Sequence, residues 1–314
     1  MFDNPHKGRG AISNPHNRYH RDTREAVDDG WFADAEDGPK FRTTVRVDHS
    51  KTILTRNQSD DIPFEVSLNP YRGCEHGCVY CFARPTHAYL DLSPGLDFER
   101  IIIAKPDAPA LLRKELAKKN YQCKPIALGS NTDPFQPIER EQRITRQILE
   151  VLQEQRHPLT IVTKSAMVER DIDILAEMAQ DKLVQVMISI CTLDKHIARS
   201  MEPRASTPVR RLQAIARLHE AGVPVGVLVA PMIPVLTDPE LETVLAACAE
   251  HGASSAGYVL LRLPLEVAPL FEEWLRAHFP LKAEHVLTRV RDTRGGALYR
   301  AAVSYTHLRA HETK

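Results

Sequence analysis

Three cysteines share one short segment of the chain, residues 69–82. Cys74, Cys78 and Cys81 follow the spacing CxxxCxxC, and an aromatic residue, Tyr80, stands directly before the third thiol. Cysteine thiolates hold iron–sulfur clusters, and a cubane cluster has one more iron than this loop has thiols. Three protein ligands therefore leave one iron with an open coordination position. The segment predicts a [4Fe–4S] cluster on these cysteines that binds a further molecule.

A structural zinc ion is the alternative for the same thiols. Such a site takes a fourth ligand, which His76 or His87 would supply. The usual zinc patterns pair two CxxC segments, or one CxxC with a pair of histidines, and the sequence has no second pair. The other cysteines, Cys123, Cys191 and Cys248, are scattered singly. This favours reduced thiols in a cytoplasmic protein over a disulfide framework.

The cysteine segment resembles the signature of the radical S-adenosylmethionine (SAM) superfamily, which is CxxxCxxC with an aromatic residue before the third cysteine. The resemblance implies that the amino and carboxylate groups of SAM chelate the free iron. It implies that electron transfer then cleaves SAM to methionine and a 5′-deoxyadenosyl radical. It further implies that Cys74, Cys78 and Cys81 are catalytic, and that an external donor such as flavodoxin or ferredoxin reduces the cluster. The substrate that loses a hydrogen atom is not identified.

Composition places few limits on the partners. Apolar residues make up 43% of the 314 positions, charged residues make up 26%, and the net charge is zero. Because the net charge is zero, no overall electrostatic field favours binding to a nucleic acid or a membrane. A zero net charge does not exclude a local basic groove. The first ten residues contain no apolar signal segment, and the longest apolar stretch, residues 223–236, is interrupted by prolines. We therefore expect a cytoplasmic protein without a membrane partner.

Beyond the cysteines, short apolar runs alternate with longer amphipathic stretches. The runs predict strands at Phe64–Leu68, Pro125–Leu128, Leu159–Thr163, Val184–Ile190, Val223–Ala230 and Gly257–Leu263. The amphipathic stretches predict helices at Ala108–Lys119, Arg140–Gln155, Val168–Gln180, Pro208–Ala221, Pro239–Glu250 and Val267–His278. Continuous Val, Ile and Leu runs are typical of strands buried on both faces of a parallel sheet.

This alternation predicts an α/β fold with right-handed crossovers. Periodicity alone does not separate a flat doubly wound sheet from a partial barrel. The family resemblance implies a partial (β/α)6 barrel with the cluster loop after the first strand, as the cysteines are placed here. In a barrel of this kind, the other catalytic groups follow the carboxyl ends of later strands.

Three regions are expected along the chain. Residues 1–60 predict a largely irregular or disordered N-terminal arm, because the first part of it is polar and shows little apolar periodicity. Residues 61–302 form the expected radical SAM core. Residues 303–314 predict a non-native tail, since Val303–Thr313 resembles the translation of a sequencing adapter. That resemblance implies a core that is truncated at its C-terminal end.

A closer resemblance covers about residues 69–263. It is to the spore photoproduct lyase-like, or DNA repair photolyase-like, branch of the superfamily. Its motifs are Gly129-Ser-Asn-Thr-Asp-Pro, Val162-Thr-Lys-Ser, Ile188-Ser-Ile, Met201-Glu-Pro-Arg and Val229-Ala-Pro-Met-Ile. Carried over by position, the resemblance implies SAM contacts from Thr132, Lys164 and Ser189. It also implies that Tyr80 lies near the adenine and that Arg204 contacts the ribose or carboxylate. A lysine ammonium suits the SAM carboxylate, and hydroxyls suit its amino acid or ribose portions.

One departure from the branch concerns Ser130. The branch has a cysteine at this position, three residues before Asp133, which returns a hydrogen atom to the product radical. An O–H bond is much harder to homolyse than an S–H bond, so repair of pyrimidine photoproducts in DNA is only the alternative reaction. Nucleic acid remains an expected substrate class. The competing class of protein is a zinc-binding structural or nucleic-acid-binding module without catalysis.

Overall fold

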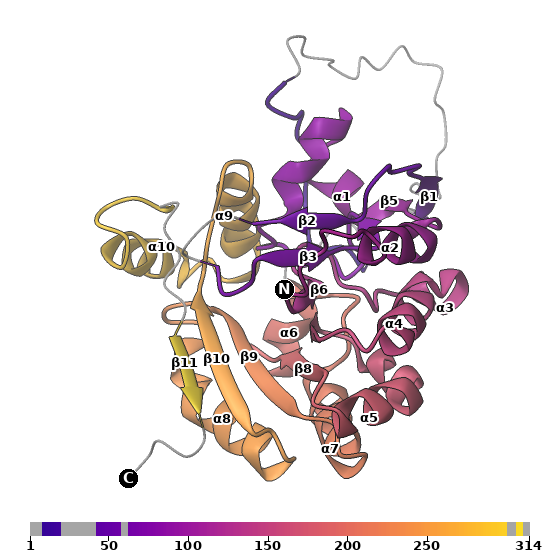
Figure 1. The fold of residues 1–314 in the computed structure, drawn as a ribbon. Coiled ribbons are helices and arrows are strands. Elements are labelled where there is room, and N and C mark those ends of the chain that lie inside the picture. The colour runs from indigo at the N-terminus through magenta and orange to yellow at the C-terminus, as the bar shows by residue number, and fades with distance from the viewer. Residues whose placement is uncertain (1–7, 20–41, 58–61, 300–305, 310–314) are drawn as a thin grey trace.

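The computed structural model describes residues 8–19, 42–57, 62–299 and 306–309. A mixed sheet runs through its centre in the strand order β11-β10-β9-β8-β7-β6-β3-β2 (Figure 1). The strands are β2 (Leu54–Arg56), β3 (Val66–Leu68), β6 (Ile126–Leu128), β7 (Leu159–Thr163), β8 (Val184–Ser189), β9 (Val225–Met232), β10 (Ser255–Leu260) and β11 (Thr306–Arg309). The strands β3, β6, β7, β8, β9 and β10 run parallel to one another. At the two edges of the sheet, β2 and β11 pair antiparallel with their neighbours.

Burial explains the continuous apolar runs. Every residue of β3 and β6 is buried, as are all of those of β8 except Gln185. Layers of side chains cover both faces of these strands, so alternation with polar residues is absent. The predicted α/β fold is confirmed, and the sheet is open because its edge strands β2 and β11 do not pair with each other.

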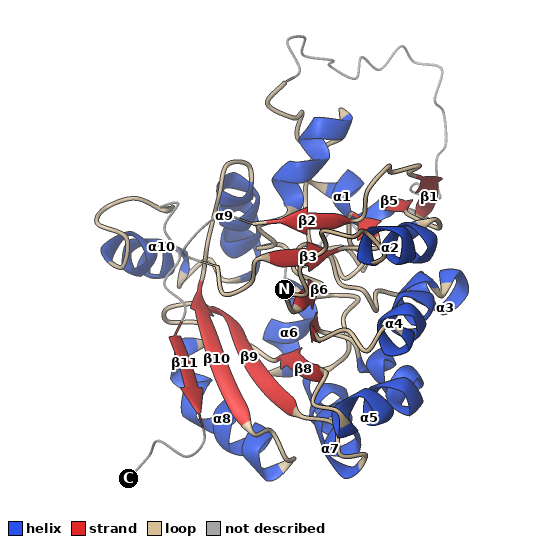
Figure 2. Cartoon of the chain, viewed as in Figure 1, coloured by secondary structure: helices blue, strands red, loops and turns tan. Residues whose placement is uncertain are grey.

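Helices such as α4, α5, α7 and α8 lie around the sheet in Figure 2, and α5, α7 and α8 contact its strands directly. The helices are α1 (Leu96–Arg100), α2 (Ala108–Leu116), α3 (Glu139–Gln142), α4 (Ile144–Glu154), α5 (Ile172–Gln180), α6 (Lys195–Met201), α7 (Pro208–Glu220), α8 (Leu241–Glu250), α9 (Val267–His278) and α10 (Ala283–Asp292). Short 3₁₀ segments are η1 (Arg84–Leu90), η2 (Ala166–Asp171) and η3 (Asp238–Glu240). Across the described ranges, no helix combines the length and apolar character needed to cross a bilayer.

The predicted helix 140–155 is interrupted. Arg143 adopts a left-handed conformation with φ of 51°, which separates α3 from α4. The buried carboxylate of Glu139 accepts hydrogen bonds from the amides of Thr145 and Arg146 at 3.1 and 3.4 Å. The first amides of α4 have no partner within the helix, and Glu139 accepts their hydrogen bonds. In a continuous helix these amides would bond to carbonyl groups of the preceding turn.

Part of the predicted irregular arm is regular. A small second sheet has the order β1-β5-β4, with β1 at Thr44–Val47, β5 at Ile101–Ala104 and β4 at Tyr71–Arg72. All four side chains of β1 are exposed, so neither face of the strand is buried, and its pairing with β5 defines it. In the predicted tail, Thr306–Arg309 forms β11, and the rest of 303–314 lies outside the described residues.

Candidate active site

The three cysteines lie on a buried loop that follows β4. Cys74 and Cys78 are 7% and 8% exposed, Cys81 is half-buried, and all three thiols are free. Gly73 and Gly77 have φ angles of +78° and +67°. A Cβ atom at Gly73 would lie 2.9 Å from the carbonyl oxygen of Phe98. The loop requires glycine at these positions because the backbone is both left-handed and tightly packed.

Burial favours the neutral form of the thiols in this loop. Burial raises the pKa of the Cys74 thiol well above its ordinary value, and charges on Asp133, Cys78 and Cys81 raise it further. Burial and the Glu202 carboxylate raise the pKa of Cys78 to about 12. Without a metal, the thiols are therefore held neutral. A bound cation that takes up thiolate ligands would reverse this preference.

The donor set fits a cluster better than a single zinc ion. In the part of the chain that the structure describes, no three His, Cys, Asp or Glu side chains are grouped as ligands of one metal ion. In a cubane, each thiolate binds a different iron, so the thiols need not converge on one point. In the two candidate fourth ligands of zinc, one ring nitrogen lies near another group, and Nδ1 of His87 has no hydrogen-bond partner among the described residues. Nε2 of His87 lies 3.1 Å from the carbonyl oxygen of Ile101, and Nδ1 of His76 lies 3.3 Å from Oδ2 of Asp133.

Lys164 lies directly beyond β7, at the edge where SAM contacts were expected. Asp133 fixes this turn, because its carboxylate accepts hydrogen bonds from the Lys164 amide and the Thr163 hydroxyl, both at 2.7 Å. The Lys164 ammonium lies 5.9 Å from the centre of the Tyr80 ring. Burial acts to lower the pKa of Lys164, but the negative charge of Cys78, where its thiol is ionised, and that of Glu202 outweigh it, so this pKa is raised. The site thus contains a stable cation beside the thiols.

Ser189 ends β8 with a buried hydroxyl that has no hydrogen-bond partner. A buried polar atom without a partner is destabilising, and it marks a place where a bound molecule can donate or accept a hydrogen bond. This unsatisfied hydroxyl, together with the free thiols and the lysine, is the feature of the structure that fits a bound cofactor.

Thr132 and Arg204 are already engaged. The Thr132 hydroxyl donates to the carbonyl oxygen of Tyr71 at 3.0 Å. The Arg204 guanidinium lies 3.0 Å from a carboxylate oxygen of Glu75 and donates to the Thr43 hydroxyl at 3.2 Å. Arg204 therefore supports the cysteine loop from the side of Glu75. Both side chains would have to keep these bonds while contacting a ligand.

Sequence reasoning missed two buried charged residues, Glu202 and Arg211. The Glu202 carboxylate accepts hydrogen bonds from the Tyr80 hydroxyl and from Arg211, and Cys191 Sγ lies 3.7 Å away. Arg211 also donates to the carbonyl oxygen of Ser189 at 2.8 Å. Burial acts to raise the pKa of Glu202, but Arg211 and Lys164 outweigh it and lower the pKa. Glu202 belongs to a motif noted in the sequence, yet no local signal indicates that helix α7 brings Arg211 to it.

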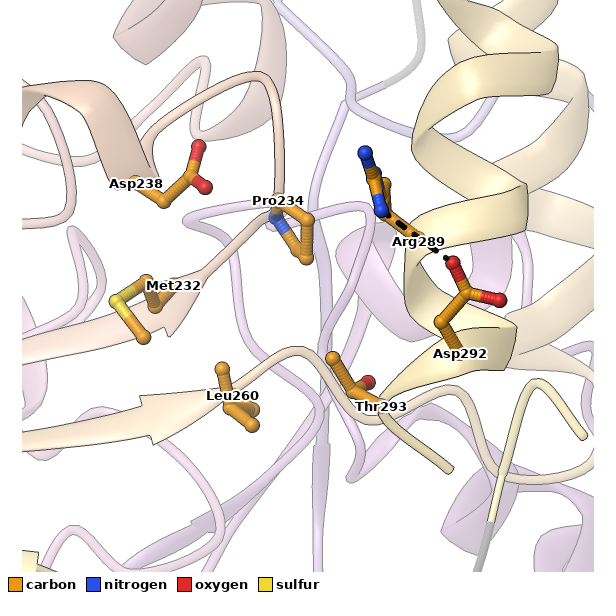
Figure 3. Close-up of a pocket in the computed structure, with 7 residues that line it drawn as sticks. All are labelled: Met232, Pro234, Asp238, Leu260, Arg289, Asp292 and Thr293. Carbon is orange, nitrogen blue, oxygen red and sulfur yellow. Dashed lines mark ion pairs between the residues drawn. The ribbon is translucent and has the colours of Figure 1, made fainter. Parts of the chain in front are cut away.

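A separate hollow of about 460 Å³ lies at the carboxyl ends of β9 and β10. Figure 3 shows its lining, which combines apolar side chains from the sheet with the ion pair of Arg289 and Asp292 on α10. None of the residues expected to bind SAM lines it. The hollow therefore lies beside the candidate site and does not form it.

The chain resembles known proteins in sequence and in fold. A sequence model of the radical SAM superfamily matches residues 68–248. The chain is 39% identical over 220 residues to an uncharacterized protein of Mycobacterium tuberculosis, which covers 69% of this chain and 65% of that relative. An uncharacterized protein of Methanocaldococcus jannaschii is 26% identical over 213 residues, covering 68% of this chain and 76% of that protein. The match thus spans less than two thirds of the mycobacterial relative's length.

Solved structures with a similar fold include spore photoproduct lyase. Its complex with dinucleoside spore photoproduct has a TM-score of 0.57 and 19% identity, covering 77% of this chain and 68% of that chain. A double mutant of the same lyase with bound AdoMet and dinucleoside spore photoproduct has a TM-score of 0.54 and 17% identity, covering 76% of this chain and 66% of that one. At this level of identity, the likeness is one of fold.

Proposed function

Because the chain belongs to the radical SAM superfamily, we propose that it is an enzyme that cleaves SAM reductively, with a [4Fe–4S] cluster on Cys74, Cys78 and Cys81. When bound, the cluster supplies the electron for this cleavage, and the 5′-deoxyadenosyl radical of the family's chemistry abstracts hydrogen from the substrate. The observation that carries the proposal is the buried loop of three free thiols beside Ser189, whose hydroxyl has no partner.

The residues around the thiols have separable roles in this proposal. The Lys164 ammonium neutralises the SAM carboxylate, and its raised pKa keeps it charged at neutral pH. The Ser189 hydroxyl supplies a hydrogen bond that the protein alone does not satisfy. Tyr80 presents its ring to the adenine while its hydroxyl stays bound to Glu202. Thr132 and Arg204 are weaker candidates for SAM contacts because other groups already engage them.

The substrate class that we propose is a nucleic acid. The support is the fold, which is shared with a lyase whose structures hold a dinucleoside photoproduct. The support does not extend to that lyase's reaction, because Ser130 stands where the branch has its hydrogen-donating cysteine. The proposal also includes a flavodoxin or ferredoxin as electron donor. Cytoplasmic location is part of the proposal because reduced thiols suit that compartment.

Anaerobic reconstitution with iron and sulfide tests the proposal. We expect a brown protein whose visible absorption bleaches with dithionite, and which then converts SAM to 5′-deoxyadenosine. The competing zinc module predicts a colourless protein that retains zinc and leaves SAM intact. A protein that binds zinc tightly and fails to take up iron under these conditions would contradict the proposed function.

A further inference from the structure

An irregular segment, residues 9–18, crosses from helix α1 to helix α9. We call it the N-terminal strap. On one side, the backbone amide of Asp97 on α1 donates to the Asn14 side chain at 3.0 Å. On the other side, the Ser13 hydroxyl donates to Glu273 on α9 at 2.6 Å. Ala11 of the strap packs with Leu96 of α1 and Leu270 of α9 in one small apolar cluster. The strap therefore links α1, which precedes β5 of the small sheet, to α9, which follows β10 of the main sheet.

The strap also reaches a buried ion pair behind the cysteine loop. The amides of Gly10 and Ala11 donate to the two carboxylate oxygens of Glu99 at 3.0 and 2.8 Å. Arg9 donates to the carbonyl oxygen of Glu99 at 2.6 Å. The Glu99 carboxylate lies 2.5 Å from Arg84, and both side chains are fully buried. A buried charge pair needs such additional hydrogen bonds to offset its lost hydration.

Arg84 carries this connection to the cluster ligands. Its guanidinium donates to the carbonyl oxygens of Gly77 and Cys78 at 3.2 and 2.9 Å. The strap also touches the loop directly, because a Cβ atom at Gly10 would lie 1.8 Å from the carbonyl oxygen of Gly77. Ile12 packs against the apolar cluster that contains Cys78. The strap thus contacts Glu99, Glu99 pairs with Arg84, and Arg84 donates hydrogen bonds to the cysteine loop.

We propose that the N-terminal strap is a positioning element of the cluster site, which closes the cysteine loop against water through Glu99 and Arg84. This inference rests on the proposed function for its meaning, but the closure itself is a property of the iron-free chain. Solvent exposure and hydrogen bonding around the sulfurs set the properties of an iron–sulfur cluster. The strap would therefore protect the loaded cluster without touching SAM or substrate.

Gly10→Ala tests the strap, with Gly226→Ala on β9 as its matched control. The new methyl at Gly10 meets the backbone oxygen of Gly77, whereas a Cβ at Gly226 meets the Ser255 side chain at 2.4 Å, so the control is also crowded but touches neither the strap nor the cysteine loop. The probe is iodoacetamide, and the readout is the alkylation rate of Cys78 and Cys81 in the iron-free protein, mapped by mass spectrometry. We expect Gly10→Ala to react about tenfold faster or more, because the opening equilibrium loses hydrogen bonds to a charged group. Gly226→Ala should react like wild type.

A second readout is the loss of visible absorption when the reconstituted protein meets air, which should be faster in Gly10→Ala. If Gly10→Ala does not fold, Arg9→Met carries the same test, because it removes the hydrogen bond from Arg9 to the carbonyl oxygen of Glu99 and adds no methyl at Gly10. Wild-type alkylation rates in a folded Gly10→Ala protein would overturn the inference. A wild-type chain that binds no iron would instead contradict the proposed function, and the alkylation rates would still decide the role of the strap.

Discussion

At the scale of single residues, the site combines groups that are costly to bury. Cys74 and Cys78 are buried thiols, Lys164 is a half-buried cation, and the buried hydroxyl of Ser189 lacks a partner. A folded protein gains little stability from such a set. The set becomes useful when a ligand supplies the missing charges and hydrogen bonds, which is why it indicates binding more strongly than any one of its members.

Replacing one cluster ligand provides the simplest test of the thiols. We expect Cys74→Ala, Cys78→Ala or Cys81→Ala to leave almost no stable cluster, because each removes one of only three protein ligands. Cys123→Ala and Cys248→Ala are the controls, since these thiols lie outside the site, and they should bind iron like wild type. Iron and sulfide content after anaerobic reconstitution measures the effect. A full cluster in Cys78→Ala would contradict the ligand assignment.

Ser189→Ala should act in opposite directions on stability and binding. Removing a buried hydroxyl without a partner should raise the free energy of unfolding of the iron-free protein by about 1 kcal/mol. The same change should weaken SAM binding about 2- to 10-fold, because it removes one neutral hydrogen bond. Urea unfolding and calorimetry measure the two effects.

Ser254→Ala is the matched control for that prediction. Its hydroxyl already donates to the carbonyl oxygen of Val225 at 3.1 Å, on a strand end away from the thiols. This variant should lose a little stability and keep wild-type SAM affinity. A Ser189→Ala protein that behaves in the same way would show that the hydroxyl of Ser189 does not face SAM.

Sequence prediction at this scale depended on spacing along the chain. The three thiols lie within one loop, so their spacing alone indicates their chemistry. Arg211 and Glu202 meet only because α7 packs beside β8, and no local pattern links the motif that contains Glu202 to Arg211. Arg204 illustrates the opposite case. Its motif suggested a SAM contact, whereas the structure pairs it with Glu75, a partner that lies in the cysteine loop itself.

At the scale of elements, the six parallel strands followed from their apolar runs, because burial on both faces leaves a strong signature. The start of α7 has an equally local cause, because Thr207 precedes Pro208 and its hydroxyl accepts a hydrogen bond from the Arg210 amide at 3.4 Å. The break at Arg143 was not predictable in this way. It depends on the buried Glu139 carboxylate, whose position is set by contacts distant in sequence.

Segment η1 carries a buried histidine with a testable pH dependence. Burial lowers the pKa of His87 from 6.5 to about 4. Between these values the unfolded chain takes up a proton that the folded chain refuses, so stability is full above pH 6.5 and falls as the pH drops toward 4. The expected loss is about 3 kcal/mol. Urea unfolding of wild type and His87→Leu at neutral pH and near the lower limit measures it.

The effect of His87 is isolated by comparing how steeply the free energy of unfolding falls with decreasing pH in wild type and in His87→Leu. His87→Leu also loses the hydrogen bond to Ile101, so it should be less stable at every pH. Its stability should nevertheless fall less steeply with acid than that of wild type, because the group that resists protonation is gone. Identical slopes in the two proteins would mean that His87 does not titrate in this window.

At the scale of the whole molecule, the question is which reaction the fold supports. Ser130 lies beyond β6, where its hydroxyl oxygen accepts a hydrogen bond from Asn69 at 3.2 Å. We expect the reduced protein to form 5′-deoxyadenosine from SAM without restoring thymines from a synthetic spore photoproduct, since an alcohol does not return the hydrogen atom. Chromatography of both products after anaerobic incubation measures the outcome.

Ser130→Cys provides the matched variant. It adds a thiol at this one position, so the appearance of repaired thymine in this variant alone would support both the nucleic-acid substrate class and the role of the position. Repeated turnover of the photoproduct by the wild-type chain would instead contradict the argument from Ser130.

The contacts of the strap also bear on when the cysteine thiols are accessible during translation. Ser13 and Glu273 are 260 positions apart, and Arg18 and its partner Glu266 are 248 positions apart. A ribosome therefore releases the cysteine loop well before α9 exists, and contacts of such long separation form late. We expect a nascent chain halted at Arg262 to be alkylated faster than the complete chain, because the strap then lacks its contacts with α9, and α9 does not yet pack beside Cys78. During translation, a cluster-delivery protein would then meet open thiols, and completion of the chain would seal them.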